Sequence, residues 1–281
     1  GGQNNQPVGG SASGTINKPT KVTYPSDVDG KALNVMGNWD SNCLITTEGK
    51  MFCNGKGDSG QQGDGSIADN SYYSEVSGSH TDVVNGCQSY QTTCMILSSG
   101  AVKCWGLDSA GELGNGATTT GNQNTPQDVT DIDGSEDGKS AVKCTIGYDE
   151  ACALLKDGTV KCWGDGNHGA LAPGTDNDNT DQTSPTLANG INILGVTVTD
   201  IFMSMSGTGF LIGDNKLYAW GYAVNGKAGT GTTTSIYTPV EIFLGAASAY
   251  GTKAASGSGD SFTKDPKCAT CPSGFTNVAG D

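Results

Sequence analysis

Arginine is absent from this chain of 281 residues, and all 15 of its basic residues are lysines. Against them stand 29 acidic residues, so the formal net charge is −14. Nucleic-acid binding needs a basic face, because neutralising phosphates supplies much of the affinity, and we therefore expect no nucleic-acid partner. The same charge disfavours binding to an anionic membrane surface.

Long apolar runs and histidines are also scarce. No stretch approaches the ~18 consecutive apolar residues of a membrane-spanning helix, so we expect no membrane insertion. A signal-peptide pattern is missing too, and we expect a mature or trimmed chain. The only histidines, His80 and His168, lie in polar loops without a G-x-S-x-G elbow. Because a nucleophile triad needs a histidine base, and no P-loop or dinucleotide fingerprint is present, we expect no enzyme.

Glycine and cysteine are plentiful instead. The chain has 44 glycines and 10 cysteines, a composition typical of secreted, turn-rich β-proteins. Apolar residues come in short runs without a sustained helical period. The pattern therefore predicts an all-β fold.

One segment recurs four times along the chain. In the first three copies two cysteines stand ten positions apart, and in the fourth both are replaced together, by Gly209 and Ala219. The copies read CLITTEGKMFCNG at 43–55, CMILSSGAVKCWG at 94–106, CALLKDGTVKCWG at 152–164 and GFLIGDNKLYAWG at 209–221. The joint loss indicates bonded partners. The predicted disulfides are Cys43–Cys53, Cys94–Cys104 and Cys152–Cys162.

Each copy also has the pattern of a β-hairpin, with two short β-rich runs around a turn. A three-residue loop needs a left-handed last residue, and this position holds Gly49, Gly100, Gly158 and, in the fourth copy, Asn215. The hairpin places the two cysteines opposite each other, about 4.5 Å apart at Cα in a non-hydrogen-bonded pair, close to disulfide range. Buried free thiols are one alternative; zinc is the other, but CxxC pairs and histidines are missing here.

The position after the second cysteine recurs at residues 54, 105, 163 and 220, in steps of 51, 58 and 57 residues. Periods of this size are typical of propeller blades or solenoid turns. The order C-A-L-x-x-D-G-x-V-x-C-W-G, then G-x-L-G-x-G, then P-x-x-V resembles the regulator of chromosome condensation repeat over residues 18–262. The resemblance implies a β-propeller array of four-stranded blades, about four here and five if a last half unit counts.

Family propellers have about seven blades, whereas four full units are visible in this sequence. Residues 239–262 resemble the start of a blade without its closing hairpin. They could complete the first blade, and we expect the ring to close within one chain. A small ring, an open ring or completion by other chains are the alternatives. The expected domains are a flexible lead (1–17), the repeat domain (18–262) and a disulfide-bearing tail (263–281).

Four cysteines lie outside the hairpin pairs: Cys87, Cys144, Cys268 and Cys271. Cys87 and Cys144 precede two neighbouring hairpins, by seven and eight residues, so they occupy equivalent places. We expect a Cys87–Cys144 bridge between adjacent blades and a Cys268–Cys271 bridge in the tail. Separate links of Cys87 and Cys144 to the tail pair are the alternative. A thiol-redox role of the tail CxxC is disfavoured, because it lacks the helical context that lowers a thiol pKa.

These features favour an extracellular or cell-surface recognition module, adhesin-like or carried on a fibre or larger oligomer, that binds a protein or glycan through propeller loops. The candidate contact residues are Tyr72, Tyr73, Asp176, Asp178, Asp181, Tyr222 and Tyr237. The tyrosines can serve only if they are exposed, and packing under their own loops is the alternative for them. A family branch that inhibits beta-lactamases uses a propeller face, so a secreted protein inhibitor acting through such a face is the alternative. The cysteines and acidic charge oppose the nuclear nucleotide-exchange role of the family's namesake.

No cofactor is expected, and calcium is the one candidate metal. Two acidic loops place oxygen ligands at alternate positions, which is the chemistry that calcium prefers. One loop has Asp131, Asp133 and Asp137, and the other has Asp176, Asp178 and Asp181. Neither is a twelve-residue loop that ends in glutamate, and solvated turns are the alternative reading of both.

Overall fold

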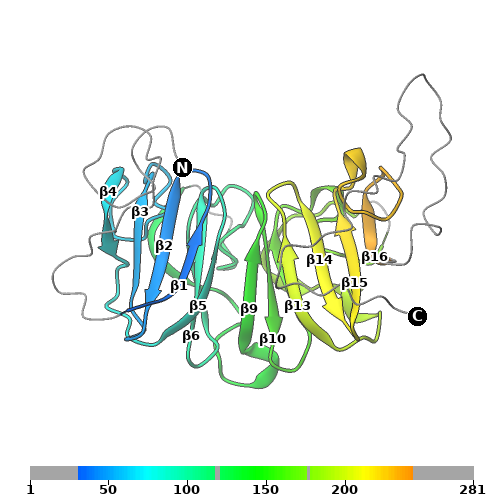
Figure 1. The fold of residues 1–281 in the computed structure, drawn as a ribbon, viewed down its shortest axis with the longest axis horizontal. Helices are drawn as coiled ribbons and strands as arrows, with labels where there is room; N and C mark the ends of the chain where they lie inside the picture. The colour runs from blue at the N-terminus through cyan, green and yellow to red at the C-terminus, as the bar shows by residue number, and fades with distance from the viewer. Residues whose placement is uncertain (1–30, 118–120, 176–177, 243–281) are drawn as a thin grey trace, which may run out of the picture. The chain divides into compact units, whose positions relative to one another are not determined.

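The computed structural model describes residues 31–242 except 118–120 and 176–177 (Figure 1). These residues form four antiparallel sheets of four strands, each in sequence order. The blades consist of β1 (Ala32–Gly37), β2 (Ser41–Thr46), β3 (Met51–Gly55) and β4 (Asn70–Glu75); β5 (Val83–Gln88), β6 (Thr92–Leu97), β7 (Val102–Gly106) and β8 (Gln123–Asp128); β9 (Ala141–Ile146), β10 (Glu150–Leu155), β11 (Val160–Gly164) and β12 (Gln182–Leu187); β13 (Val198–Met203), β14 (Thr208–Gly213), β15 (Lys216–Gly221) and β16 (Ile236–Ile242). The predicted all-β fold of four-stranded blades is confirmed.

Helical structure among the described residues is confined to short connections. It comprises α1 (Asn189–Asn192) and the 3₁₀ turns η1 (Asp137–Lys139), η2 (Asn167–Gly169) and η3 (Val224–Gly226). No helix in this part of the chain has the length and apolar character needed to cross a bilayer. The predicted lead, the tail with Cys268 and Cys271, and most of 239–262 lie outside the described residues.

The first three hairpins have the predicted geometry. In each one the two cysteines are register partners and form a disulfide with a Cα–Cα distance of 4.1 Å. In the third, Leu155 N–H donates to Thr159 O at 2.8 Å, which closes a loop of residues 156–158. Gly158 ends that loop with φ of 88°, in the left-handed region that favours glycine.

The fourth hairpin differs from the prediction by one residue. Its loop has two residues, Asp214 and Asn215, with φ of 51° and 59°, because Gly213 pairs directly with Lys216. This shortening places Phe210, and not Gly209, opposite Ala219. The cysteine positions of the fourth blade are therefore occupied by Phe210 and Ala219.

Each blade has two faces that pack differently. We call the face with the hairpin cysteines the forward face, because it packs against the next blade. Cys94 and Cys104 thus share a buried cluster with Ala153 and Trp163 of the third blade.

The opposite face, here the rear face, carries the tryptophan. The indole Nε1 atoms donate to main-chain oxygens of the preceding blade's glycine-rich loop: Trp105 to Gln61 at 2.9 Å, Trp163 to Glu112 at 2.9 Å and Trp220 to Ala170 at 2.8 Å.

The first strand of each blade, here called its inner strand, makes much of the contact between blades. β5 packs on β1 and β2, β9 on β5 and β6, and β13 on β9 and β10. Within the described residues, extensive packing of strands joins consecutive blades, and none joins the first blade to the fourth. In Figure 1 the blades follow one another from blue to yellow in chain order. The expected closure of the ring therefore stays a prediction that involves residues outside this region.

Cys87 and Cys144 bond across the second and third blades, with a Cα–Cα distance of 5.7 Å. The two residues are not equivalent, contrary to the prediction. Cys87 is the register partner of Cys94 and lies on the forward face, whereas Cys144 is the partner of Ala153 and lies on the rear face. This offset of one residue turns the two thiols toward each other, since side chains alternate along a strand.

Candidate functional site

A row of large side chains lies at the turns that join each inner strand to the second strand. Main-chain hydrogen bonds close these turns, from Asn38 N–H to Ser41 O, from Ser89 N–H to Thr92 O and from Gly147 N–H to Glu150 O. The first central residue of each turn is aromatic. The row consists of Trp39, Tyr90 and Tyr148, and Met205 lies in the corresponding turn of the fourth blade.

The three rings contact one another across blades. The centroids of Trp39 and Tyr90 are 6.3 Å apart in an edge arrangement, and those of Tyr90 and Tyr148 are 6.0 Å apart and nearly parallel. Trp39 is 75% exposed and Tyr148 47% exposed, while Tyr90 between them is half-buried. Adjacent apolar rings that are accessible to solvent make this row a candidate binding surface. We call these three residues the aromatic row.

The turns beneath the aromatic row are linked laterally. The amide Nδ2 of Asn38 donates to Ser89 O, and Ser89 Oγ donates to Tyr148 O at 3.4 Å. Asn38 also fixes its own turn, because its Oδ1 accepts from the main-chain N–H groups of Asp40 and Ser41. The rings therefore stand on a hydrogen-bonded support that spans three blades, which reduces the entropy lost on binding.

Carboxyl groups flank the aromatic row. Glu150, at the end of the Tyr148 turn, is buried, and this burial raises its pKa to about 8. Burial also raises the pKa of Asp149 to about 6, and the charges of Glu112 and Asp165 add to that effect. Among the described residues Glu150 Oε1 and Asp149 Oδ1 have no hydrogen-bond partner. A protonated carboxyl group is a hydrogen-bond donor, so this end of the blades combines flat apolar rings with acidic groups of either charge state.

One cation belongs to the same surface. Lys56 Nζ lies 5.7 Å from the ring centroid of Tyr90 and 3.0 Å from a carboxylate oxygen of Asp58. The hydrogen bond to Asp58 raises the pKa of Lys56 above its ordinary value. Cation–π contacts of this kind stabilise an aromatic ring in one orientation.

The residues predicted from the inserts differ in exposure and surroundings. Tyr72 is 49% exposed, whereas Tyr73 is buried with Leu44 and Phe52, so Tyr73 packs inside its blade and does not offer a contact surface. Adjacent residues of a strand point to opposite faces, and only one of this pair can face solvent. Tyr222 packs on His168 with ring centroids 4.4 Å apart, and its ring lies 4.3 Å from Lys227 Nζ.

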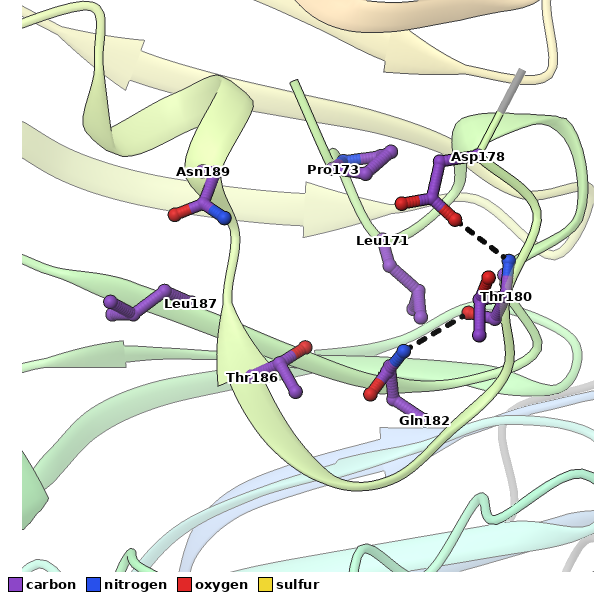
Figure 2. A pocket seen from close by; sticks show the side chains of 9 residues that line it. Leu171, Pro173, Asp178, Thr180, Gln182, Thr186, Leu187 and Asn189 are labelled. Carbon is purple, nitrogen blue, oxygen red and sulfur yellow. Dashed lines mark hydrogen bonds between the residues drawn. The ribbon is translucent and has the colours of Figure 1, made fainter. Parts of the chain in front are cut away.

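Asp178 and Asp181 support the third insert from within. Asp178 accepts from Thr180 N–H at 3.1 Å and Asp181 from Gly166 N–H at 3.0 Å, while Tyr237 OH donates to Asn179 at 3.3 Å. Figure 2 shows Asp178 and Thr180 at the edge of a small hollow of about 160 Å³. A hollow of that volume is smaller than typical ligand pockets. Asp176 lies outside the described residues.

The structure does not assemble the first predicted calcium site, at Asp131, Asp133 and Asp137. Within the described residues, no group of three or more acidic, histidine or cysteine side chains converges on a common point. Asp133 instead accepts from Ser135 N–H at 2.9 Å, and Asp137 pairs with Lys156 at 2.8 Å. The alternate acidic residues at 131–137 therefore serve a turn and an ion pair. The second set includes Asp176 and is described only in part.

Sequence reasoning missed the aromatic row, although the chain carries a pattern for it. Trp39, Tyr90 and Tyr148 each stand four residues before the first cysteine of a hairpin. The recurrence places one ring at the same turn of three consecutive blades, and consecutive blades bring those turns together.

These blades define a β-propeller type of protein. Residues 141–170 match the family model for the "Regulator of chromosome condensation (RCC1) repeat". One segment of the chain, within the third blade, is thus similar to this repeat family.

Solved structures share the fold of this chain, and curated relatives share part of its sequence. Human WBSCR16 has a TM-score of 0.69 at 21% identity, over 80% of this chain and 56% of that one. Prp20p of Saccharomyces cerevisiae has a TM-score of 0.65 at 15% identity, over 78% and 52%. The ultraviolet-B receptor UVR8 of Arabidopsis thaliana is 25% identical over 72% of this chain and 44% of its own. Human E3 ubiquitin-protein ligase HERC2 is 28% identical over 51% of this chain and 3% of its own. The chain therefore covers at most 56% of the length of any of these four proteins, and only 3% of HERC2.

Proposed function

We propose that this chain is an extracellular or cell-surface recognition module that binds a protein partner through the aromatic row. The observation that carries the proposal is the presence of three neighbouring aromatic rings at the same turn of three consecutive blades, one pair edge to face and one pair stacked, on a hydrogen-bonded support. Aromatic anchors of this kind are enriched where proteins bind each other. The module acts by binding and not by turnover.

The choice of a protein partner follows from the neighbours of the rings. Carboxyl groups of Asp58 and Asp149 flank the rings, and the whole chain carries a net charge of −14. A complementary partner presents apolar side chains together with lysine or arginine. The Prp20p structure was described with its binding to Gsp1p and histones, so a solved propeller of this fold does bind proteins.

The extracellular location is supported by the disulfides. Four disulfides lie within the described residues, and their cysteines are all buried. Disulfides persist in oxidising compartments and are rare in the cytosol. The disulfides therefore support the proposed extracellular or cell-surface location of the module.

A secreted inhibitor is the second candidate, because the aromatic row lies on the strand turns and not on the long inserts. Both candidates use the same rings. They differ in whether the bound protein is an enzyme that loses activity.

The test uses the full chain as a probe on arrays of extracellular proteins and of glycans. Wild type is compared with the triple variant Trp39→Ser, Tyr90→Ser and Tyr148→Ser, and with Tyr72→Ser as the exposed control. We expect a protein hit that the triple variant loses and the control keeps. A hit that survives the triple variant, or a glycan hit alone, contradicts the proposal.

A further inference from the structure

The fourth blade presents a forward face that no following blade covers among the described residues. Phe202 of β13 is 58% exposed, Ile212 of β14 is 41% exposed and Val240 of β16 is 45% exposed. By register, Ile212 has three counterparts in the earlier blades: Ile45, Ile96 and Leu154. These counterparts are at most 4% exposed, because the next blade packs on them.

Apolar side chains form a continuous row across this face of the sheet, in which Phe202 and Val240 are exposed, Phe210 is half-buried and Ala219 is buried. Phe202 is the register partner of Phe210, Phe210 of Ala219 and Ala219 of Val240. The ring centroids of Phe202 and Phe210 are 6.4 Å apart. This row stands where the first three blades carry their hairpin disulfides under a neighbouring blade. The face thus has the composition of a blade interface, and the residues up to 242 that the structure describes supply no following blade.

The first blade has the complementary surface. By register, Val35 of β1 occupies the rear-face position that holds Cys144 in β9 and Ile201 in β13. Cys144 is 5% exposed and Ile201 1% exposed, whereas Val35 is 70% exposed. Leu44, the register partner of Val35, is already buried. The accessible part of this rear face is therefore the inner strand itself, which is also the element that packs on the preceding blade elsewhere.

Existing interfaces show which residues meet. In the second and third blades, forward residue Cys87 of one inner strand is bonded to rear residue Cys144 of the next. At the interface between the first and second blades, a Cβ on Gly86 of β5 would lie 3.1 Å from Cε of Met36 of β1. The forward position of β1 and the rear position of β5 therefore meet as well. Phe202 is the fourth member of the forward series, and Val35 is the first of the rear series.

We propose that the forward face of the fourth blade binds the inner strand β1 of a second copy of this chain, with Phe202 of one copy against Val35 of the other. The contact continues the series of blade interfaces already present in the chain. This surface is separate from the aromatic row, and the proposal does not depend on the proposed function. The contact is heterologous, so copies join head to tail and either close a ring or extend.

The contact is weaker than the internal interfaces. Position 54, which holds the interblade tryptophan in later blades, is an asparagine, and the hairpin cysteines are replaced in the fourth blade. Each copy also carries a net charge of −14, which opposes association. Added salt screens that repulsion, so the association strengthens as ionic strength rises.

Cysteine trapping in the full chain tests the geometry. Val35→Cys and Phe202→Cys are made in separate chains, mixed under mild oxidation and mapped by non-reducing peptide analysis. We expect a 35–202 crosslink between chains in the mixture and no 35–35 or 202–202 crosslink in either variant alone. Ile193→Cys, at a residue that is 68% exposed, serves as the control that should not crosslink.

Each other result overturns the proposal. A 202–202 crosslink means that two fourth blades meet face to face. A 35–202 bridge within one monomer, in a chain that carries both substitutions, means that the ring closes on itself. No crosslink in the mixture means that something else covers the face or that it stays free.

If cysteine trapping is slow, a second measurement still tests the proposal. Molar mass by light scattering is recorded against protein concentration at low and high salt. Wild type should associate, and Phe202→Lys or Val35→Lys should weaken association by at least about tenfold in the dissociation constant. A mixture of the two lysine variants should form a dimer, since each keeps one intact surface. A wild type that is monomeric throughout contradicts the proposal.

Discussion

Trp163 of the third blade donates a hydrogen bond from Nε1 to the main-chain oxygen of Glu112 in the second blade, at 2.9 Å. The indole is fully buried, and Glu112 itself is 1% exposed. The contact joins a residue of the recurrent W-G motif to the glycine-rich loop of the preceding unit. The tryptophan of the W-G motif therefore forms a contact between blades in addition to packing inside its own blade.

Trp163→Phe tests this interaction. We expect a loss of about 1 to 3 kcal/mol in the free energy of unfolding, because the buried carbonyl of Glu112 loses its donor. Chemical denaturation measures the change. Trp39→Phe is the matched control, and since Trp39 is 75% exposed it should stay within about 0.5 kcal/mol. Equal losses in the two variants would show that the hydrogen bond between blades contributes nothing.

Much of the architecture could be predicted from the sequence, because the repeated hairpin is a local pattern. Two cysteines on either side of a three-residue loop with a terminal glycine determine both the register and the bond. The fourth hairpin was misaligned for a local reason as well. Gly209 and Ala219 keep the spacing of ten, which hides a two-residue turn made by Asp214 and Asn215.

The candidate site could not be predicted in the same way. The aromatic row exists because consecutive blades bring the turns of Trp39, Tyr90 and Tyr148 within about 6 Å of one another, and that proximity is a property of packing between blades. Similarly, the alternation of Tyr72 and Tyr73 shows that one faces inward, but the choice depends on the register of β4 with β3.

The bridge between blades should stabilise the chain more than a hairpin bridge does. Cys87–Cys144 spans 57 residues and Cys94–Cys104 spans 10. In the chain-entropy model these separations correspond to about 4 and about 3 kcal/mol. We therefore expect Cys87→Ala with Cys144→Ala to lower the unfolding free energy by about 1 kcal/mol more than Cys94→Ala with Cys104→Ala. Denaturation of both double variants provides the comparison, and the reverse order would show that packing around the hairpin dominates.

Two glycines with similar backbone conformations should respond differently to alanine. Gly106 has φ of 110° and Gly158 has φ of 88°. A Cβ on Gly106 would lie 2.0 Å from Gln91 O, whereas none of the atoms around Gly158 comes within 4 Å of its Cβ position. Gly158→Ala should cost about 1 to 2 kcal/mol, the ordinary cost of a left-handed alanine.

Gly106→Ala should cost about 3 kcal/mol or more, because the strand end must also move away from residue 91. Thermal unfolding of the two variants beside wild type measures both effects. A Gly106 variant as stable as the Gly158 variant would mean that the strand end relaxes without strain.

The buried carboxyl of Glu150 should make the stability of the chain depend on pH. Burial raises the pKa of Glu150 from 4.5 to about 8 in the folded chain, so between these values the folded state binds more protons than the unfolded state. The free energy of unfolding therefore falls as pH rises through that window. Asp149 and Asp108, whose pKa values burial raises to about 6, act in the same direction at lower pH.

Between pH 6.5 and pH 8 the titration of Glu150 is consequently the largest expected contribution of these three groups. Glu150→Gln keeps an oxygen that can accept from Asp149 N–H, which now lies 3.1 Å from Glu150 Oε2, and it removes the titration. We expect wild type to have a lower melting temperature at pH 8 than at pH 6.5. Glu150→Gln should remove most of that decrease in melting temperature. Glu48→Gln, at an exposed position of the first hairpin loop, is the control and should leave the fall unchanged. If the Glu150 variant keeps the wild-type pH dependence, other groups cause the effect. If wild type becomes more stable toward pH 8, the carboxyl of Glu150 is not held neutral in the folded chain.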